Sequence, residues 1–333
     1  MYTYRISVCV YASFLCASAV CAQPSASAAV TSSSESKGAI REREILAQFP
    51  APGQMIDIGG RKLHLLCQGK GNGPAVIIEG GALASSLSYF TAQDQIQPAA
   101  RVCTYDRAGL GWSDPAAGSR SLEARADDLH ALLGKSGLKA PYILAGHSAG
   151  GMMVQVYARK YPQDIAGIIL IESSEEMFNT TPESLARIKN TATQLGFAAT
   201  MADTGQAIPA LRVPNGPPEQ EVMQRVSAIK AGQDDFVAMS NLPTELQKLN
   251  GLSTLGATPL VVIRRGKSDP GFTEAQSLEW IKAQERLAAL STQSILLVAE
   301  KSGHAVNLDQ PELYLIAVKR IQKMLASPAR KAP

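Results

Sequence analysis

The sequence lacks the motifs that mark several common classes of binding protein. Its 333 residues include only four histidines, which are scattered along the chain. Neither a Cys-x-x-Cys pair nor a His-Glu-x-x-His motif is present, so a metal site has no support. No basic run is interleaved with aromatic residues, and the net charge of +3 is small for this length, which argues against nucleic-acid binding. The full Gly-x-Gly-x-x-Gly pattern of a dinucleotide site is also missing. We therefore expect neither a cofactor nor a nucleic-acid partner.

The N-terminus lacks the run of about 20 apolar residues that a membrane-spanning helix needs. Residues 6–20 (ISVCVYASFLCASAV) form a shorter apolar stretch that follows Arg5 and leads into the small residues VCA. This layout is typical of a secretory signal peptide cleaved after Ala22. An uncleaved anchor and a lipoprotein modified at Cys21 are the alternatives. We expect a periplasmic or secreted mature protein that has no membrane span.

The next segment, residues 23–50, is predicted to be a flexible leader followed by a short helix. Residues 23–38 are rich in Ser and Ala and nearly free of large apolar side chains, so they have little surface to bury. The stretch AIREREILAQF has helical character, and the prolines at positions 50 and 52 are expected to end it.

Apolar strand-like runs then alternate with helical segments. This alternation predicts an α/β fold, with a mostly parallel sheet covered by helices on both faces. It lapses over residues 173–258, where no strong strand signal occurs. Because that interruption is too long for an unstructured loop, we expect a helical cap there, inserted into a core formed by residues 51–172 and 259–333. Functional side chains of such a sheet follow the carboxyl ends of its strands.

The stretch AGHSAGG (145–151) places Ser148 between an apolar run and a helix. A serine at a tight strand–turn–helix junction is a candidate nucleophile, and Gly146 and Gly150 are small enough to permit the turn. The start of the following helix directs backbone N–H groups at the same place. Short motifs also occur by chance, so the interpretation depends on a base and an acid elsewhere in the chain.

A serine nucleophile needs a general base, normally histidine. His64 lies in a predicted strand and His130 on a predicted helix, so both are interpreted as structural. His147 adjoins Ser148, and its side chain should point away from the serine hydroxyl. His304 follows the last predicted strand in a short loop before a helix. By elimination and by position, His304 is predicted to be the base.

The base needs an orienting carboxylate that follows another strand. Asp269 lies in a loop directly after the run PLVVIRRG and is our preferred candidate. Glu172, at the end of IAGIILIE, is the alternative, because a carboxylate there could also reach the histidine.

Four motifs together carry a resemblance to a known superfamily: YDRAGLGWSD, AGHSAGG, PLVVIRRGKSDP and SGHAVNLDQPE. In this order they resemble the α/β-hydrolase superfamily, in its serine-nucleophile, esterase-like branch, from Met55 to Leu325 outside the cap. The order Ser148, Asp269, His304 is that of the fold. Haloalkane dehalogenases and epoxide hydrolases carry aspartate where Ser148 stands, so the resemblance implies a serine hydrolase of carboxylic esters. An amidase, a thioesterase, an acyltransferase and a non-catalytic binding protein remain alternatives.

The resemblance also implies an oxyanion hole made of two backbone N–H groups. One belongs to Ala149, the residue after the nucleophile. The other comes from the loop IIEGGALASS, where Gly80 and Gly81 take the place of the usual His-Gly pair. Ala82 is the expected second donor, and Gly81 is the alternative.

Glu79 precedes that loop and ends an apolar strand, so a buried carboxylate there would need a partner. Arg107 in YDRAG is the best candidate, and we expect a Glu79–Arg107 pair to hold the oxyanion loop in place. A solvated Glu79 at the rim of the cleft is the alternative.

Only two of the five cysteines lie outside the predicted signal peptide, Cys67 and Cys103. In an exported protein such a pair favours a disulfide, and in the strand order of this superfamily the two strands that carry them are adjacent. Two buried thiols are the alternative.

Overall fold

The computed structural model describes residues 35–118, 120–208, 218–241, 244–245 and 254–327. The predicted signal peptide and most of the predicted leader lie outside these residues. One eight-stranded sheet has the order β1-β2-β4-β3-β5-β6-β7-β8. The strands are β1 (Gln54–Asp57), β2 (Lys62–Gln68), β3 (Val76–Glu79), β4 (Val102–Tyr105), β5 (Tyr142–His147), β6 (Ile165–Ile171), β7 (Leu260–Arg265) and β8 (Ser294–Ala299).

The sheet is parallel from β4 to β8, whereas the β1–β2 and β2–β4 pairs are antiparallel. Strands β3, β4 and β5 are buried along their whole length. Successive residues of a strand face opposite sides of the sheet, so Ile143 belongs to one apolar core and Leu144 to the other. This arrangement confirms the prediction of an α/β-hydrolase fold with a mostly parallel sheet.

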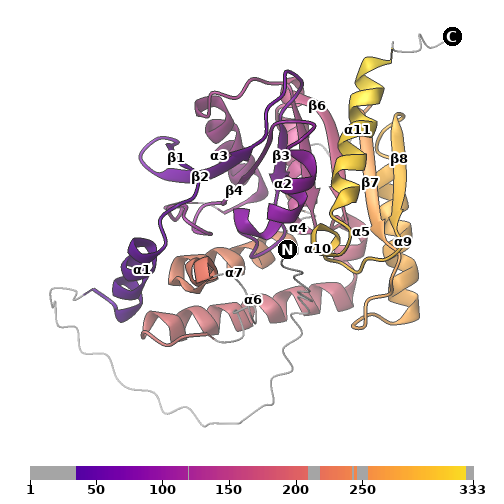
Figure 1. Cartoon of the computed structure of the whole chain (residues 1–333). Coiled ribbons are helices and arrows are strands. Elements are labelled where there is room, and N and C mark those ends of the chain that lie inside the picture. Colours follow the sequence, from indigo (N-terminus) through magenta and orange to yellow (C-terminus); the bar gives the residue numbers. More distant parts are fainter. Residues whose placement is uncertain (1–34, 119, 209–217, 242–243, 246–253, 328–333) are drawn as a thin grey trace.

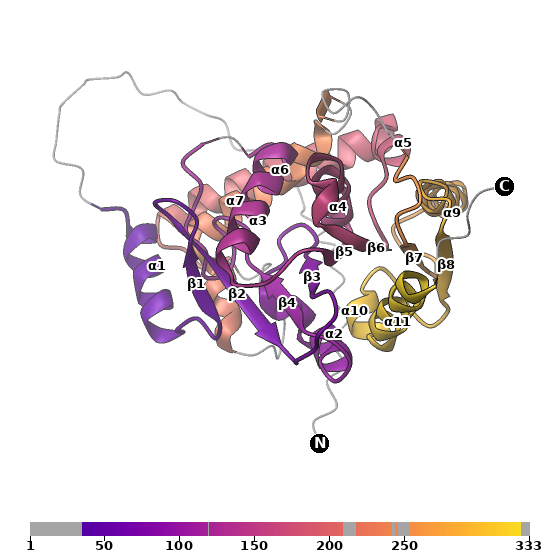
Figure 2. The same cartoon turned by 90° about the horizontal axis from the view of Figure 1, so that it is seen from above.

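Helices cover both faces of the sheet (Figure 2). Residues of α3 and α4 pack in the core on one face, and residues of α2 and α11 pack in the core on the other. The described helices outside the predicted cap are α1 (Lys37–Gln48), α2 (Phe90–Ile96), α3 (Leu122–Lys135), α4 (Ala149–Lys160), α9 (Glu274–Ala288), α10 (Val306–Asp309) and α11 (Glu312–Ala326), with 3-10 turns at Ser86–Tyr89 and Pro162–Asp164.

The segment between β6 and β7 contains helices and no strand among its described residues. Its helices are α5 (Glu176–Asn179), α6 (Pro182–Asp203) and α7 (Val226–Ser240), with a 3-10 segment at Pro218–Gln224. Figure 1 shows α6 and α7 lying together beneath the sheet. Side chains of α7 contact the loops that follow β3 and β4, so this helix lies at the carboxyl edge where functional groups gather.

A disulfide joins Cys67 to Cys103. The two residues are directly opposite each other on the antiparallel strands β2 and β4, so this link ties the antiparallel edge of the sheet to its parallel part. In the described parts of the chain, no helix is long and apolar enough to cross a bilayer.

Candidate active site

Ser148 occupies a sharp turn between β5 and α4. Its backbone is left-handed, with φ 54° and ψ −124°, a conformation that persists in a non-glycine residue only where the surroundings enforce it. Neighbouring backbone comes very close: a Cβ at Gly146 would lie 2.6 Å from Gly151 Cα, and one at Gly150 would lie 2.3 Å from Glu79 O. These glycines are therefore needed for the strained turn that exposes the serine.

The backbone N–H groups of Ala149, the residue after Ser148, and of Ala82 have no acceptor within the described part of the chain. The loop that carries Ala82 packs against Ser148, since a Cβ at Gly81 would lie 3.2 Å from Ser148 Cβ. The Gly81 N–H instead donates to the Tyr89 hydroxyl at 2.8 Å. Gly81, the alternative oxyanion donor, is thus already used.

His304 lies in the loop after β8, and its Nδ1 is 3.2 Å from Oε2 of Glu172. Glu172 directly follows β6 and is fully buried. It also accepts hydrogen bonds from the backbone N–H of Arg265 at 2.7 Å and from Nε1 of Trp280 at 3.0 Å. Burial raises the pKa of Glu172, but the hydrogen bond and charge of His304 and the charge of Arg265 outweigh it and lower the pKa. The residue beside His304 is therefore a carboxylate.

Asp269, the preferred acid from the sequence, follows β7 in the loop near Arg265. Its Oδ2 lies 3.5 Å from Nη1 of Arg265, and its Oδ1 accepts the N–H of Gly271 at 2.8 Å. The contact to the histidine is instead made by Glu172, the alternative. Glu172 is the first residue after β6 and has a longer side chain than aspartate. Asp269 comes four residues after the last residue of β7.

His147 joins the turn at Ser148 to both neighbouring loops. Its Nε2 donates to the backbone carbonyl of His304 at 2.8 Å, and its Nδ1 accepts from the Tyr89 hydroxyl at 2.9 Å. Burial and the nearby His304 lower the pKa of His147 to about 4. A neutral ring with the proton on Nε2 fits these partners, and both ring nitrogens of His147 are engaged in hydrogen bonds.

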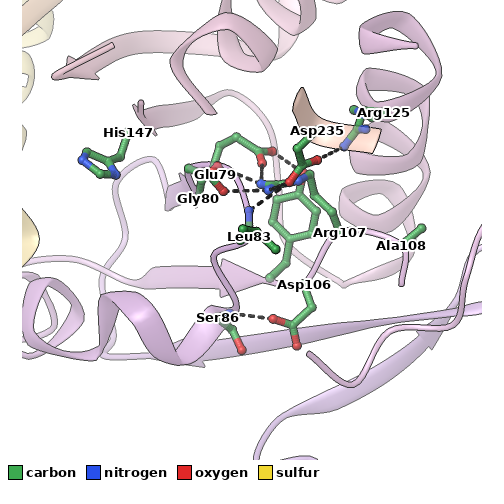
Figure 3. A network of polar contacts seen from close by, with 12 residues as sticks. Glu79, Gly80, Leu83, Ser86, Asp106, Arg107, Ala108, Arg125, His147 and Asp235 are labelled. Atoms are coloured by element: carbon green, nitrogen blue, oxygen red, sulfur yellow. Dashed lines mark hydrogen bonds and ion pairs between the residues drawn. The ribbon is translucent and has the colours of Figure 1, made fainter. Parts of the chain in front are cut away.

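The Arg107 guanidinium is hydrogen-bonded to the loop that carries Ala82 (Figure 3). Its Nη1 donates to Glu79 Oε1 and to the Gly80 carbonyl, and its Nη2 donates to the Gly81 carbonyl, each at 2.7 Å. Glu79 is buried and also accepts the Tyr105 hydroxyl, which contradicts the alternative of a solvated carboxylate. Burial raises the pKa of Glu79, and the charge of Arg107 opposes this.

Residues 74–214 match the family described as alpha/beta hydrolase fold. The strand order and the serine turn are those expected for it. The protein has the α/β-hydrolase fold. This fold leaves the chemistry of the site open, because solved structures that share it include esterases, lipases, epoxide hydrolases and dehalogenases.

Individual relatives of this α/β hydrolase are distant. A stretch of 129 residues is 34% identical to part of the probable transporter efuK of Hormonema carpetanum, and it covers 37% of this chain but only 18% of that protein. The uncharacterized protein YqjL of Bacillus subtilis is 24% identical over 78% of this chain and 88% of its own length. The solved structure of a thermophilic esterase from Thermogutta terrifontis superposes with a TM-score of 0.60 at 23% identity, over 80% of this chain and 95% of that one.

Sequence reasoning missed two residues of this hydrolase that contact its oxyanion loop, Tyr89 and Asp235. Asp235 had a detectable signal, because it falls on the apolar stripe of α7 that also contains Ala228, Gly232 and Met239. A carboxylate in such a stripe must be buried with a partner. Tyr89 had no comparable signal, since its neighbours SSLSYF show no clear periodicity.

Proposed function

We propose that this α/β hydrolase is a serine hydrolase that cleaves carboxylic esters through an acyl-enzyme. The observation that carries the proposal is the placement of His304 between a buried carboxylate and the nucleophile turn. Glu172 lies against its Nδ1, and His147, the residue before Ser148, holds its backbone carbonyl. A base fixed in this way beside a strained serine is the arrangement that nucleophilic catalysis requires.

In the proposed reaction, Ser148 Oγ attacks the acyl carbon as its proton moves to His304 Nε2. The carbonyl electrons move to the oxygen, and the N–H groups of Ala82 and Ala149 stabilise the oxyanion that forms. The intermediate collapses, the bond to the alkoxide breaks, and the alcohol leaves with the proton from His304. Water then attacks the acyl-enzyme and gives a proton to His304. The bond from the acyl carbon to Ser148 Oγ breaks, His304 returns the proton to Oγ, and the carboxylic acid is released.

We assign the orienting role to Glu172 and not to Asp269. The Glu172 carboxylate is held by three protein donors besides the histidine, two from Arg265 and one from Trp280. A carboxylate fixed in this way keeps the Nδ1–H tautomer of His304 and stabilises the imidazolium that forms during attack.

A pair of matched amide substitutions tests this assignment. E172Q should lower kcat by about 10³–10⁴-fold, as expected when the triad carboxylate becomes an amide. D269N makes the same chemical change in the loop after β7, and β7 is two strands away from β5, the strand that precedes Ser148. It should alter kcat by less than about 10-fold. The reverse pattern would assign the role to Asp269.

The reaction class is tested with a fluorophosphonate probe, which labels activated serines. Wild type should be labelled and S148A should not. A folded wild type that resists labelling would instead support a non-catalytic binding protein. Rates on p-nitrophenyl esters of increasing acyl length, with matched amides and thioesters, separate an esterase from an amidase or thioesterase, and added alcohol acceptors test for acyl transfer.

We further propose that the mature protein is exported. The signal-like residues 6–20 and the disulfide between Cys67 and Cys103 support this, because disulfides persist in oxidising compartments. Sequencing the N-terminus of the protein recovered from the periplasm or medium should give Gln23. An intact N-terminus in the cytosolic fraction would refute export.

A further inference from the structure

Helix α7 contacts the oxyanion loop at Leu83, the residue after the proposed donor Ala82. Leu83 has a left-handed backbone with φ 62°, which a residue with a branched side chain adopts only when it is held there. Its N–H donates to Oδ2 of Asp235 at 3.1 Å. Asp235 lies on α7, so the strained backbone of this loop is held by a helix that is distant in the sequence.

Asp235 also reaches the loop through Arg107 (Figure 3). The Asp235 side chain is fully buried, Arg107 Nη2 donates to its Oδ2 at 2.7 Å, and Arg125 pairs with its Oδ1. Burial raises the pKa of Asp235, but the two arginines outweigh it and lower the pKa, so the group is a carboxylate. The same Nη2 of Arg107 donates to the Gly81 carbonyl.

Gly232, three residues before Asp235 on α7, makes room for the Leu83 side chain. A Cβ at this position would lie 1.9 Å from Leu83 Cδ2. The Leu83 side chain therefore packs directly on the backbone of α7, beside an apolar cluster that includes Leu195 and Ile229. Both the backbone and the side chain of Leu83 are thus held by one turn of the same helix.

These contacts act on the direction of the Ala82 N–H. The Gly81 carbonyl and the Ala82 N–H belong to one planar trans peptide, in which they point in opposite directions. Arg107 fixes the carbonyl, and Asp235 fixes the next N–H along the chain. Because the Gly81 carbonyl and the Leu83 N–H are both held, the Ala82 N–H between them has little freedom to change direction.

We propose that Asp235 and Gly232 are positioning residues for the oxyanion hole, through which α7 sets the direction of the Ala82 N–H. The catalytic part of this proposal rests on the proposed serine hydrolase function. Under it, α7 is part of the catalytic scaffold.

D235N and D234N form a matched pair for the test. Asp234 is the adjacent residue of α7, it is partly exposed, and it pairs with Arg120 at 3.4 Å. D235N should lower kcat by about 10–100-fold with a smaller effect on KM, because a misdirected donor weakens only transition-state binding. D234N should change kcat by less than about 3-fold. Equal kcat values for the two variants would overturn the proposal.

A readout that needs no substrate separates this proposal from the esterase proposal. Amide hydrogen exchange of the peptide covering residues 79–88 should be faster in D235N than in wild type and unchanged in D234N. If wild type proves to have no hydrolase activity, the exchange result still decides whether Asp235 holds the loop. Unchanged exchange in D235N would overturn the proposal whatever the activity.

A packing variant covers the case in which D235N fails to fold. G232A places a methyl group against Leu83 and should lower kcat and speed exchange of the same peptide. Adding L83A removes the clash and should recover part of both losses. A G232A protein with wild-type kcat and wild-type exchange would overturn the proposal.

Discussion

His147 should make the folded protein less stable in mild acid. Its Nε2–H donates to the carbonyl of His304, and its Nδ1 accepts the Tyr89 O–H. A proton on Nδ1 would remove that acceptor and leave a buried hydroxyl hydrogen unpaired, which is costly. Burial and the adjacent His304 accordingly lower the pKa of His147 from 6.5 to about 4.

The size of this effect follows from the two pKa values of His147. Below pH 6.5 the unfolded chain takes up a proton that the folded protein accepts only near pH 4. Because the unfolded state binds more protons in that window, the free energy of unfolding falls as the pH falls. The loss is about 2 kcal/mol at pH 5 and about 3 kcal/mol once the pH is below 4, both relative to pH 8.

Urea unfolding of wild type and H147Q between pH 8 and pH 5 checks this. Glutamine keeps a donor and an acceptor but does not titrate, and all other groups titrate in both proteins. Wild type should therefore lose about 2 kcal/mol more than H147Q over this range. Parallel stability curves would refute the argument, as would an NMR titration that places the imidazole of His147 near pH 6.5.

Three further substitutions address the groups around the site. Y89F removes the hydroxyl that links Gly81 to His147 and should cost about 1–3 kcal/mol of stability in urea unfolding, with a lower kcat; unchanged stability would contradict the link. C67S/C103S opens a loop with a sequence separation of 36 and should lower the unfolding free energy by about 4 kcal/mol on the chain-entropy model. E79Q removes one of the two carboxylates that pair with the buried Arg107 guanidinium and should lower both the melting temperature and ester hydrolysis; wild-type values for both would refute its supporting role.

The sheet and the serine turn could be predicted because their signals are local. Apolar runs mark buried strands wherever they occur in the chain, and the glycines around Ser148 mark a turn that only small residues permit. The placement of His304 followed from the same reasoning, since it lies in the short loop between the last strand and the next helix.

The choice between two carboxylates could not be made from local signals. Asp269 matches the usual order of the superfamily, and Glu172 ends a strand that is almost entirely apolar. Which one meets the histidine depends on the packing of Arg265 and Trp280 around Glu172, which the sequence does not display. The burial of Asp235 was readable from the apolar stripe of α7, but its partners Arg107 and Arg125 are 128 and 110 residues away.

A second set of serine, histidine and carboxylate side chains meets in the described chain, and it differs from the proposed catalytic set in the surroundings of its histidine. Nδ1 of His64 lies 2.8 Å from Asp106 and 3.3 Å from the Ser86 hydroxyl, while its Nε2 accepts the N–H of Gly53. Both ring nitrogens are therefore used, and the three side chains are buried. His304 also has its Nδ1 held by a carboxylate, but its side chain is 43% exposed and its Nε2 has no partner in the described chain. A general base needs an accessible ring nitrogen within reach of the substrate's proton, and His304 has one whereas His64 does not. Residue types alone do not distinguish the two sets, because this difference lies in their surroundings.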